Sequence, residues 1–145
     1  MRPLRRVKGR EMTSTGARHL HLTILAGEFA VCRLSPEAAT IPTWAFAGHW
    51  FSLTRTDAEL SVVCPASLVP DEVQAERDWC MLRLTGPFPF DLTGVLAAIL
   101  APLAAATIPI FALSTFDTDY VLVKTPDLAR AAVALREAGH QVDEA

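Results

Sequence analysis

Three features that mark other protein classes are scarce in this sequence: long apolar runs, an excess of basic charge, and paired cysteines. The best apolar stretch, 95–110, is interrupted by Pro102 and Pro109 and falls short of the roughly 18 residues that span a bilayer. The formal net charge of −3 disfavours nucleic acid, whose phosphates bind clustered Lys and Arg. We therefore expect neither a membrane nor a nucleic acid as partner.

The cysteines are few and far apart. Cys32, Cys64 and Cys80 form no Cys-x-x-Cys motif, which argues against a disulfide framework and against a structural zinc site. Each lies in an apolar run, so buried and reduced thiols are expected. Reduced thiols are typical of the cytosol, and we predict a cytoplasmic protein.

Catalytic patterns are missing as well. The sequence has no Gly-x-Ser-x-Gly, no phosphate-binding loop and no His-Glu-x-x-His. Ser114 has no evident base, and His19 and His21 share a strand face without a third metal ligand. We expect no enzyme activity, no cofactor and no metal site.

The chain divides by composition into four segments. Segment 1–18 is basic and polar, which is the signature of a disordered tail that can be deleted without loss of stability. Segment 19–66 is an N-terminal half rich in strands, 67–77 is an acidic linker, and 78–145 is a second domain that contains helices. The expected fold class is therefore α+β, with a β half that has little helix before a mixed unit.

The strands of the N-terminal half are predicted from apolar and polar residues in alternation. Segments 20–25 and 29–34 are interpreted as one hairpin, with its turn at 26–28. Segments 50–55 and 59–64 are interpreted as a second hairpin.

The second domain has a different spacing of apolar residues. Val95, Ile99 and Leu103 recur at helical spacing, and Thr125-Pro126-Asp127 is typical of a helix start. The predicted elements are, in order, strand 79–85, helix 91–106, strands 109–114 and 120–124, a helix from 126 to a Gly139 cap, and a short strand from 141. This β-α-β-β-α-β order is that of the ferredoxin-like unit.

The predicted topology brings polar residues together at one edge. If the strand at 79 runs upward, the start of the first helix near Gly94 and the turn 114–119 both lie at the top. A helix N-terminus offers free N–H groups to a carboxylate, and Asp117 or Asp119 can hold an ammonium group. A free amino acid or a similar small zwitterion fits that combination.

An interpretation without a ligand remains open for the same residues. Ser, Thr and Asp are ordinary turn residues that bind their own backbone, so the edge can be only a turn. The domain is then a structural interaction module that pairs with another chain and binds no ligand. The helix rich in alanine and leucine between 94 and 106 favours self-association in either case, and a homodimer is expected.

From about Asp78 to Val142 the chain resembles the ACT domain, in the branch that includes the CASTOR arginine sensors of animal cells. The resemblance rests on GPFPFDLTGVLAAILAPLAAATIPIFALSTFDTDYVLV and on the Pro126–Leu135 helix. The segment from His21 to Pro65 is similar to the N-terminal half of small bacterial tandem members.

The resemblance implies a regulatory sensor that binds an amino acid at an interface between ACT-like domains. It implies the following ligand-binding residues: Gly94, Val95, Leu96, Ser114, Thr115, Phe116, Thr118 and Asp119.

Overall fold

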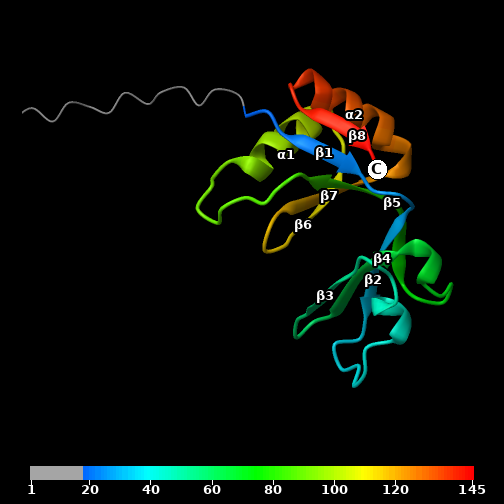
Figure 1. The fold of residues 1–145 in the computed structure, drawn as a ribbon. Helices are drawn as coiled ribbons and strands as arrows, with labels where there is room; N and C mark the ends of the chain where they lie inside the picture. The colour runs from blue at the N-terminus through cyan, green and yellow to red at the C-terminus, as the bar shows by residue number, and fades with distance from the viewer. Residues whose placement is uncertain (1–17) are drawn as a thin grey trace, which may run out of the picture.

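A computed structural model describes residues 18–145, so the tail predicted over 1–18 lies almost entirely outside the described residues. The chain forms an eight-stranded sheet with two α-helices and three short 3₁₀ helices (Figure 1). The strands are β1 (His21–Ile24), β2 (Phe29–Leu34), β3 (Ser52–Arg55), β4 (Leu60–Pro65), β5 (Ala75–Leu84), β6 (Ile110–Ser114), β7 (Asp119–Lys124) and β8 (Gln141–Glu144). The helices are α1 (Val95–Ala105), α2 (Leu128–Glu137), η1 (Thr43–Phe46), η2 (Ala66–Leu68) and η3 (Thr125–Asp127).

The α+β class and the β-α-β-β-α-β order from β5 to β8 are confirmed. The strands of this unit lie in the order β6-β7-β5-β1-β8, so β1 of the N-terminal half is inserted between β5 and β8. Strand β1 runs antiparallel to β5 and parallel to β8. The N-terminal half therefore contributes one strand to the sheet of the second unit.

The predicted hairpin between the first two strands is wrong. Both β1 and β2 run antiparallel to β5, β1 beside its C-terminal end and β2 beside its N-terminal end. Strands β1 and β2 lie one after the other along the same edge of β5, because β5, with ten residues, is long enough to pair with both. The second predicted hairpin, β3 with β4, is confirmed. Strand β5 begins at Ala75, inside the segment expected to be a linker.

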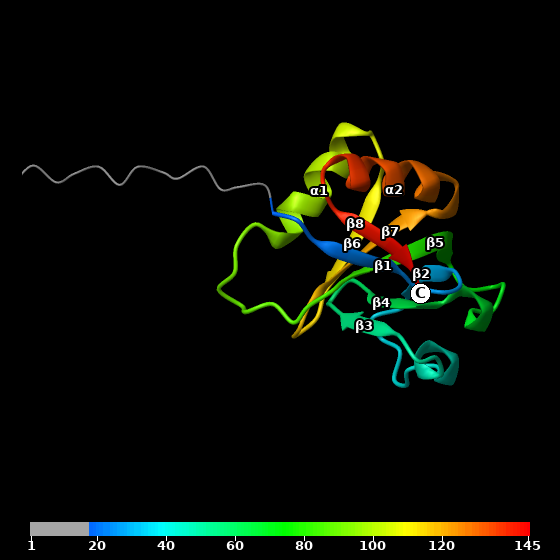
Figure 2. The ribbon, with the colours of Figure 1, turned by 45° about the horizontal axis from the view of Figure 1, so that its top comes forward.

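The two α-helices cover one face of the sheet (Figures 1 and 2). The predicted stripe of Val95, Ile99 and Leu103 is the buried face of α1. These side chains pack with Leu82, Leu84 and other aliphatic residues from the helix-facing side of the strands. Each fully buried Leu or Ile contributes roughly 1.5–3 kcal/mol to folding, so this cluster fixes the position of α1 on the sheet.

The opposite face of the sheet is packed by aromatic residues. Phe29, Trp79 and Met81 form its core, and the Trp50 ring stands edge-on to Phe29 at 5.8 Å and to Tyr120 at 5.3 Å between centroids. Trp50 comes from the segment before β3. The N-terminal half thus covers part of the face that lacks helices.

A third cluster fills the N-terminal half, and it contains Cys32 and Cys64 at diagonal positions on the paired strands β2 and β4. The hydrogen bond between the two thiols raises the pKa of Cys64 above its usual range and lowers the pKa of Cys32. Both thiols and Cys80 are buried and free, which agrees with the expectation from the sequence.

Pro102 lies inside α1, which is assigned as one continuous helix from Val95 to Ala105. Because proline has no N–H, the Ala98 carbonyl one turn earlier lacks its usual helical partner. The His140 ring supplies the missing donor, with Nε2 at 3.0 Å from the Ala98 oxygen. Its Nδ1 accepts a hydrogen bond from the Leu20 N–H at 3.1 Å, so this buried ring joins α1 to the chain entering β1.

Candidate functional site

The loop before α1 is fastened to the turn between β6 and β7. The Phe88 N–H donates to the Asp117 carbonyl at 2.8 Å. A Cβ atom on Gly86 would lie 2.8 Å from the same oxygen, so only glycine fits there without a shift of the backbone. Two segments about thirty residues apart in the sequence are thus held together, as the predicted topology requires.

Within the turn, two hydroxyl groups bind backbone. The Thr115 N–H and Oγ1 both donate to the Thr118 carbonyl, at 2.8 and 3.1 Å. The Thr118 hydroxyl donates to the Leu84 carbonyl at 2.7 Å, which ties the turn to the end of β5. These two side chains therefore shape the turn, as the simpler interpretation of the sequence expects.

Ser114 and Asp119 are placed differently. They face each other at the ends of β6 and β7, and the Ser114 hydroxyl donates to the Asp119 carboxylate at 2.5 Å. Alternation along β7 puts Asp119 on the same side as Val121, which packs under the helices. The Ser114–Asp119 pair thus lies on the helix side of the sheet, next to the start of α1.

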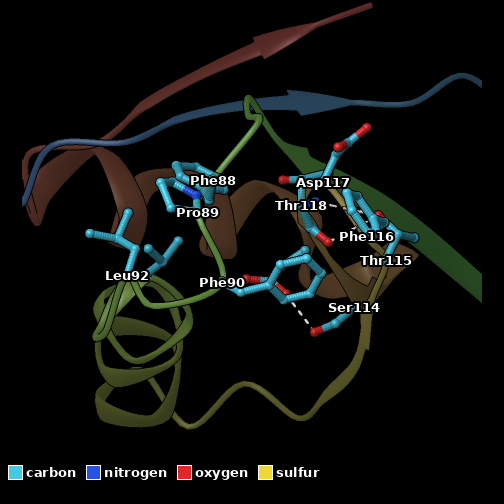
Figure 3. A pocket seen from close by; sticks show the side chains of 11 residues that line it. Phe88, Pro89, Phe90, Leu92, Ser114, Thr115, Phe116, Asp117 and Thr118 are labelled. Carbon is cyan, nitrogen blue, oxygen red and sulfur yellow. Dashed lines mark hydrogen bonds between the residues drawn. The ribbon is translucent and has the colours of Figure 1, made fainter.

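A hollow of about 220 Å³ opens between the loop and the turn, and we call it the first hollow (Figure 3). Phe90 lies over it beside Ser114, and Leu92 closes the side toward α1. The residues that line it are Phe88, Pro89, Phe90, Leu92, Val95, Ser114, Thr115, Phe116, Asp117, Thr118 and Asp119. Its loop side is apolar and its turn side is mostly polar, and a mixture of apolar residues with a few polar groups is usual for a small-molecule site.

The Phe90 and Phe116 rings form an edge-to-face pair at the mouth of the first hollow, with centroids 4.9 Å apart. They are 77% and 79% exposed, respectively, which is far more than large aromatic side chains usually are. Aromatic faces held this way can cover an apolar chain or a cation.

The charges around the first hollow have one sign. Asp117 and Asp119 are its only ionisable lining residues, and no Lys, Arg or His is among them. An anionic group would have to bind the backbone N–H groups at the start of α1, where Gly94 has φ +82° and no side chain blocks the approach. The electrostatics favour a ligand with at least one positive group.

The predicted site residues are largely brought together. Six of them line the first hollow: Val95, Ser114, Thr115, Phe116, Thr118 and Asp119. Gly94 and Leu96 do not line it; Gly94 precedes α1 with its Cα facing open space, and Leu96 packs partly against the core. Sequence reasoning missed Phe88, Phe90 and Leu92. The signal for them was the Pro-Phe-Pro-Phe run before the helix, where two prolines stiffen a loop that presents aromatic rings.

Two further observations concern metal ions and membrane spans. Among residues 18–145, no three His, Cys, Asp or Glu side chains are grouped so that they could hold a metal ion. In the same range, no helix is long and apolar enough to cross a membrane.

Two family models match parts of the chain. A family model described as the ACT domain matches residues 74–137, which contain the loop, α1 and the turn. Residues 74–137 therefore belong to the ACT-domain family. A second family model, described as an N-terminal domain, matches residues 27–72.

A curated relative has a named function. The cytosolic arginine sensor for mTORC1 subunit 1 of Mus musculus is 35% identical over 96 residues, which make up 64% of this chain. Those residues span only 28% of the mouse protein. This chain is therefore similar to part of a sensor, and that relative is a regulatory protein by its name.

The solved structures agree on the fold. A structural-genomics protein of Agobacterium tumefaciens is 40% identical, with a TM-score of 0.83, and the match covers 89% of this chain and 96% of that one. The regulatory subunit of aspartate kinase from Thermus thermophilus is 11% identical with a TM-score of 0.55, over 77% of this chain and 93% of that one, and shows the fold alone.

Proposed function

We propose that this protein is a regulatory sensor that binds a free amino acid in the first hollow. The single observation that carries the proposal is the Ser114–Asp119 pair beside the open N-terminus of α1. A carboxylate and free N–H groups at one small cavity complement the two charges of a zwitterion.

In this arrangement each part of the ligand has a place. The ligand carboxylate binds N–H groups at the start of α1, and its ammonium binds Asp119. The side chain lies against the exposed faces of the Phe90 and Phe116 rings. The two exposed rings favour a cationic side chain, and no basic residue lines the hollow to repel it. The name of the mouse relative points to arginine as the first candidate.

The first hollow is open on one side, and we propose that a second copy of the chain closes it. Among the described strands β6 pairs only with β7, so its outer edge is free. Ala97, Ala101, Ala104 and Ala105 of α1 are exposed in the single chain. A homodimer that covers this face would place the ligand at an interface between domains. The buried free thiols support a cytoplasmic location.

A melting experiment with free amino acids tests the sensor. A ligand at about 100 times its dissociation constant stabilises the folded state by about 2.7 kcal/mol, which is on the order of ten degrees for a chain of this size. Asp119→Asn is nearly isosteric and should remove most of that shift without unfolding the unliganded protein. Asp91→Asn is the matched control, because Asp91 is exposed nearby but does not line the first hollow.

Two results would contradict the proposal. One is a full panel of amino acids at millimolar concentration that leaves the melting temperature unchanged. The other is a ligand that calorimetry shows to bind Asp119→Asn as tightly as wild type. The apolar exposed face of α1 would then favour the second candidate, an interaction module that pairs with another chain. Light scattering with and without the ligand reports the proposed dimer directly.

A further inference from the structure

A second hollow, of about 400 Å³, lies behind the same turn. Its polar lining consists of Arg83, Thr85, Thr115, Asp117, Thr118 and Tyr120. Arg83 and Tyr120 are direct partners on β5 and β7. Their neighbours Leu82 and Val121 face the helices, so alternation places Arg83 and Tyr120 on the opposite face of the sheet. The two hollows are therefore on opposite sides of one turn.

The second hollow carries both signs of charge, unlike the first. Arg83 and Asp117 are both exposed. Within residues 18–145, neither side chain forms a hydrogen bond or an ion pair, with each other or with a third group. A guanidinium and a carboxylate that line one cavity without pairing leave room between them for a molecule that carries both opposite charges.

One wall of this hollow is packed against other aromatic rings. The Tyr120 ring packs edge-on against Trp50, which packs in turn against Phe29. The three rings run from the N-terminal half to the edge of the cavity. Trp50 is thus a positioning residue for Tyr120, and it gives the N-terminal half a role in shaping the cavity.

We propose that the second hollow is a separate binding site for a small zwitterion, whose carboxylate pairs with Arg83 and whose ammonium pairs with Asp117. The Tyr120 hydroxyl is placed to donate to the same carboxylate. The site does not depend on the first hollow being occupied. It is distinct from the first in chemistry, because only here does a basic side chain line the cavity.

The two sites share a wall and so should influence each other. The Asp117 carbonyl holds Phe88 and with it the loop of the first hollow. The Asp117 side chain points away from Phe90 and Ser114 (Figure 3). A ligand that draws the Asp117 side chain toward Arg83 acts on the residue that fixes the loop.

Nuclear magnetic resonance on the ¹⁵N-labelled full chain separates the two sites. The probes are glycine, alanine and glutamate at millimolar concentration, with acetate and methylammonium as probes of a single charge. We expect the zwitterions to move the amide signals of Arg83, Thr85 and Tyr120, and the singly charged probes to do so far more weakly. Arg83→Gln and Asp117→Asn should each weaken binding at least about tenfold, which corresponds to about 1.4 kcal/mol.

Asp119→Asn provides the control that keeps this proposal apart from the proposed function. It should leave the response at Arg83 and Tyr120 within about twofold of wild type, because Asp119 lies on the other face of the sheet. The proposal is overturned if no zwitterion moves the signals of Arg83, Thr85 and Tyr120. It is also overturned if Arg83→Gln, folded as judged by its amide spectrum, responds with wild-type affinity.

Discussion

The contact between His140 and the helix carbonyl freed by Pro102 leads to a quantitative prediction. His140→Phe keeps a ring of similar shape but removes both hydrogen bonds, to the Ala98 carbonyl and from the Leu20 N–H. A buried group left without its partner costs about 1–3 kcal/mol. With two such groups, the free energy of unfolding should fall by roughly 2–6 kcal/mol.

The origin of that loss is tested by a second change, Pro102→Ala. An alanine at this position has an N–H that can donate to the Ala98 carbonyl along the helix. In the Pro102→Ala protein, His140→Phe leaves only the Leu20 N–H without a partner. The loss in free energy of unfolding should therefore be smaller by about 1–3 kcal/mol. The difference between the two costs is the coupling energy of the double-mutant cycle.

Urea unfolding of the four proteins measures that coupling. His49→Phe is the control for the substitution itself, because His49 is exposed and its effect should stay within about 0.5 kcal/mol. If His140→Phe costs the same with Pro102 and with alanine there, within about 0.5 kcal/mol, the ring does not replace the missing helical donor and our reasoning is wrong.

Three further predictions concern other contacts. Gly86→Ala should destabilise the protein by about 1–3 kcal/mol in urea unfolding, because its Cβ would meet the Asp117 carbonyl at 2.8 Å; an unchanged midpoint would contradict the close approach. Hydrogen bonds from Gln141 and His21 lower the pKa of Asp143. The stability that its carboxylate contributes is therefore present above the ordinary carboxyl pKa and is lost as pH falls through the lowered value. Asp143→Asn should lower the melting temperature at neutral pH and leave it unchanged in strong acid. The buried thiols should react with a maleimide only as fast as the protein opens, and rapid labelling of the native protein would show that they are accessible.

The architecture of the site could be predicted from the sequence because it depends on local patterns. The spacing of Val95, Ile99 and Leu103 defines α1. Once the order of elements is known, the topology alone brings the start of α1 to the turn before Asp119. Side-chain identities then supply the chemistry of the first hollow.

Other features could not be predicted, because they depend on contacts between distant residues. The pairing of β1 with β5 and β8 leaves no local mark in the sequence, and the segment 26–28, interpreted as a hairpin turn, is only a bend between β1 and β2. The role of His140 has no signal in the sequence, since its two hydrogen-bond partners lie 42 and 120 residues away. Arg83 is the one exposed residue in the otherwise buried segment 79–84 of β5, and the sequence does not show that Asp117 lines the same hollow.

The insertion of β1 between β5 and β8 also bears on how the protein is made. During synthesis β1 leaves the ribosome early, but one of its two neighbours, β8, is made last, since the strands meet across about 120 residues. The sheet of the second unit therefore cannot close until nearly the whole described chain has emerged, and contacts of such long range slow folding. A cut between residues 66 and 75 would separate β1 from both neighbours, so the two halves should not be expressible as independent fragments, although each has its own buried cluster.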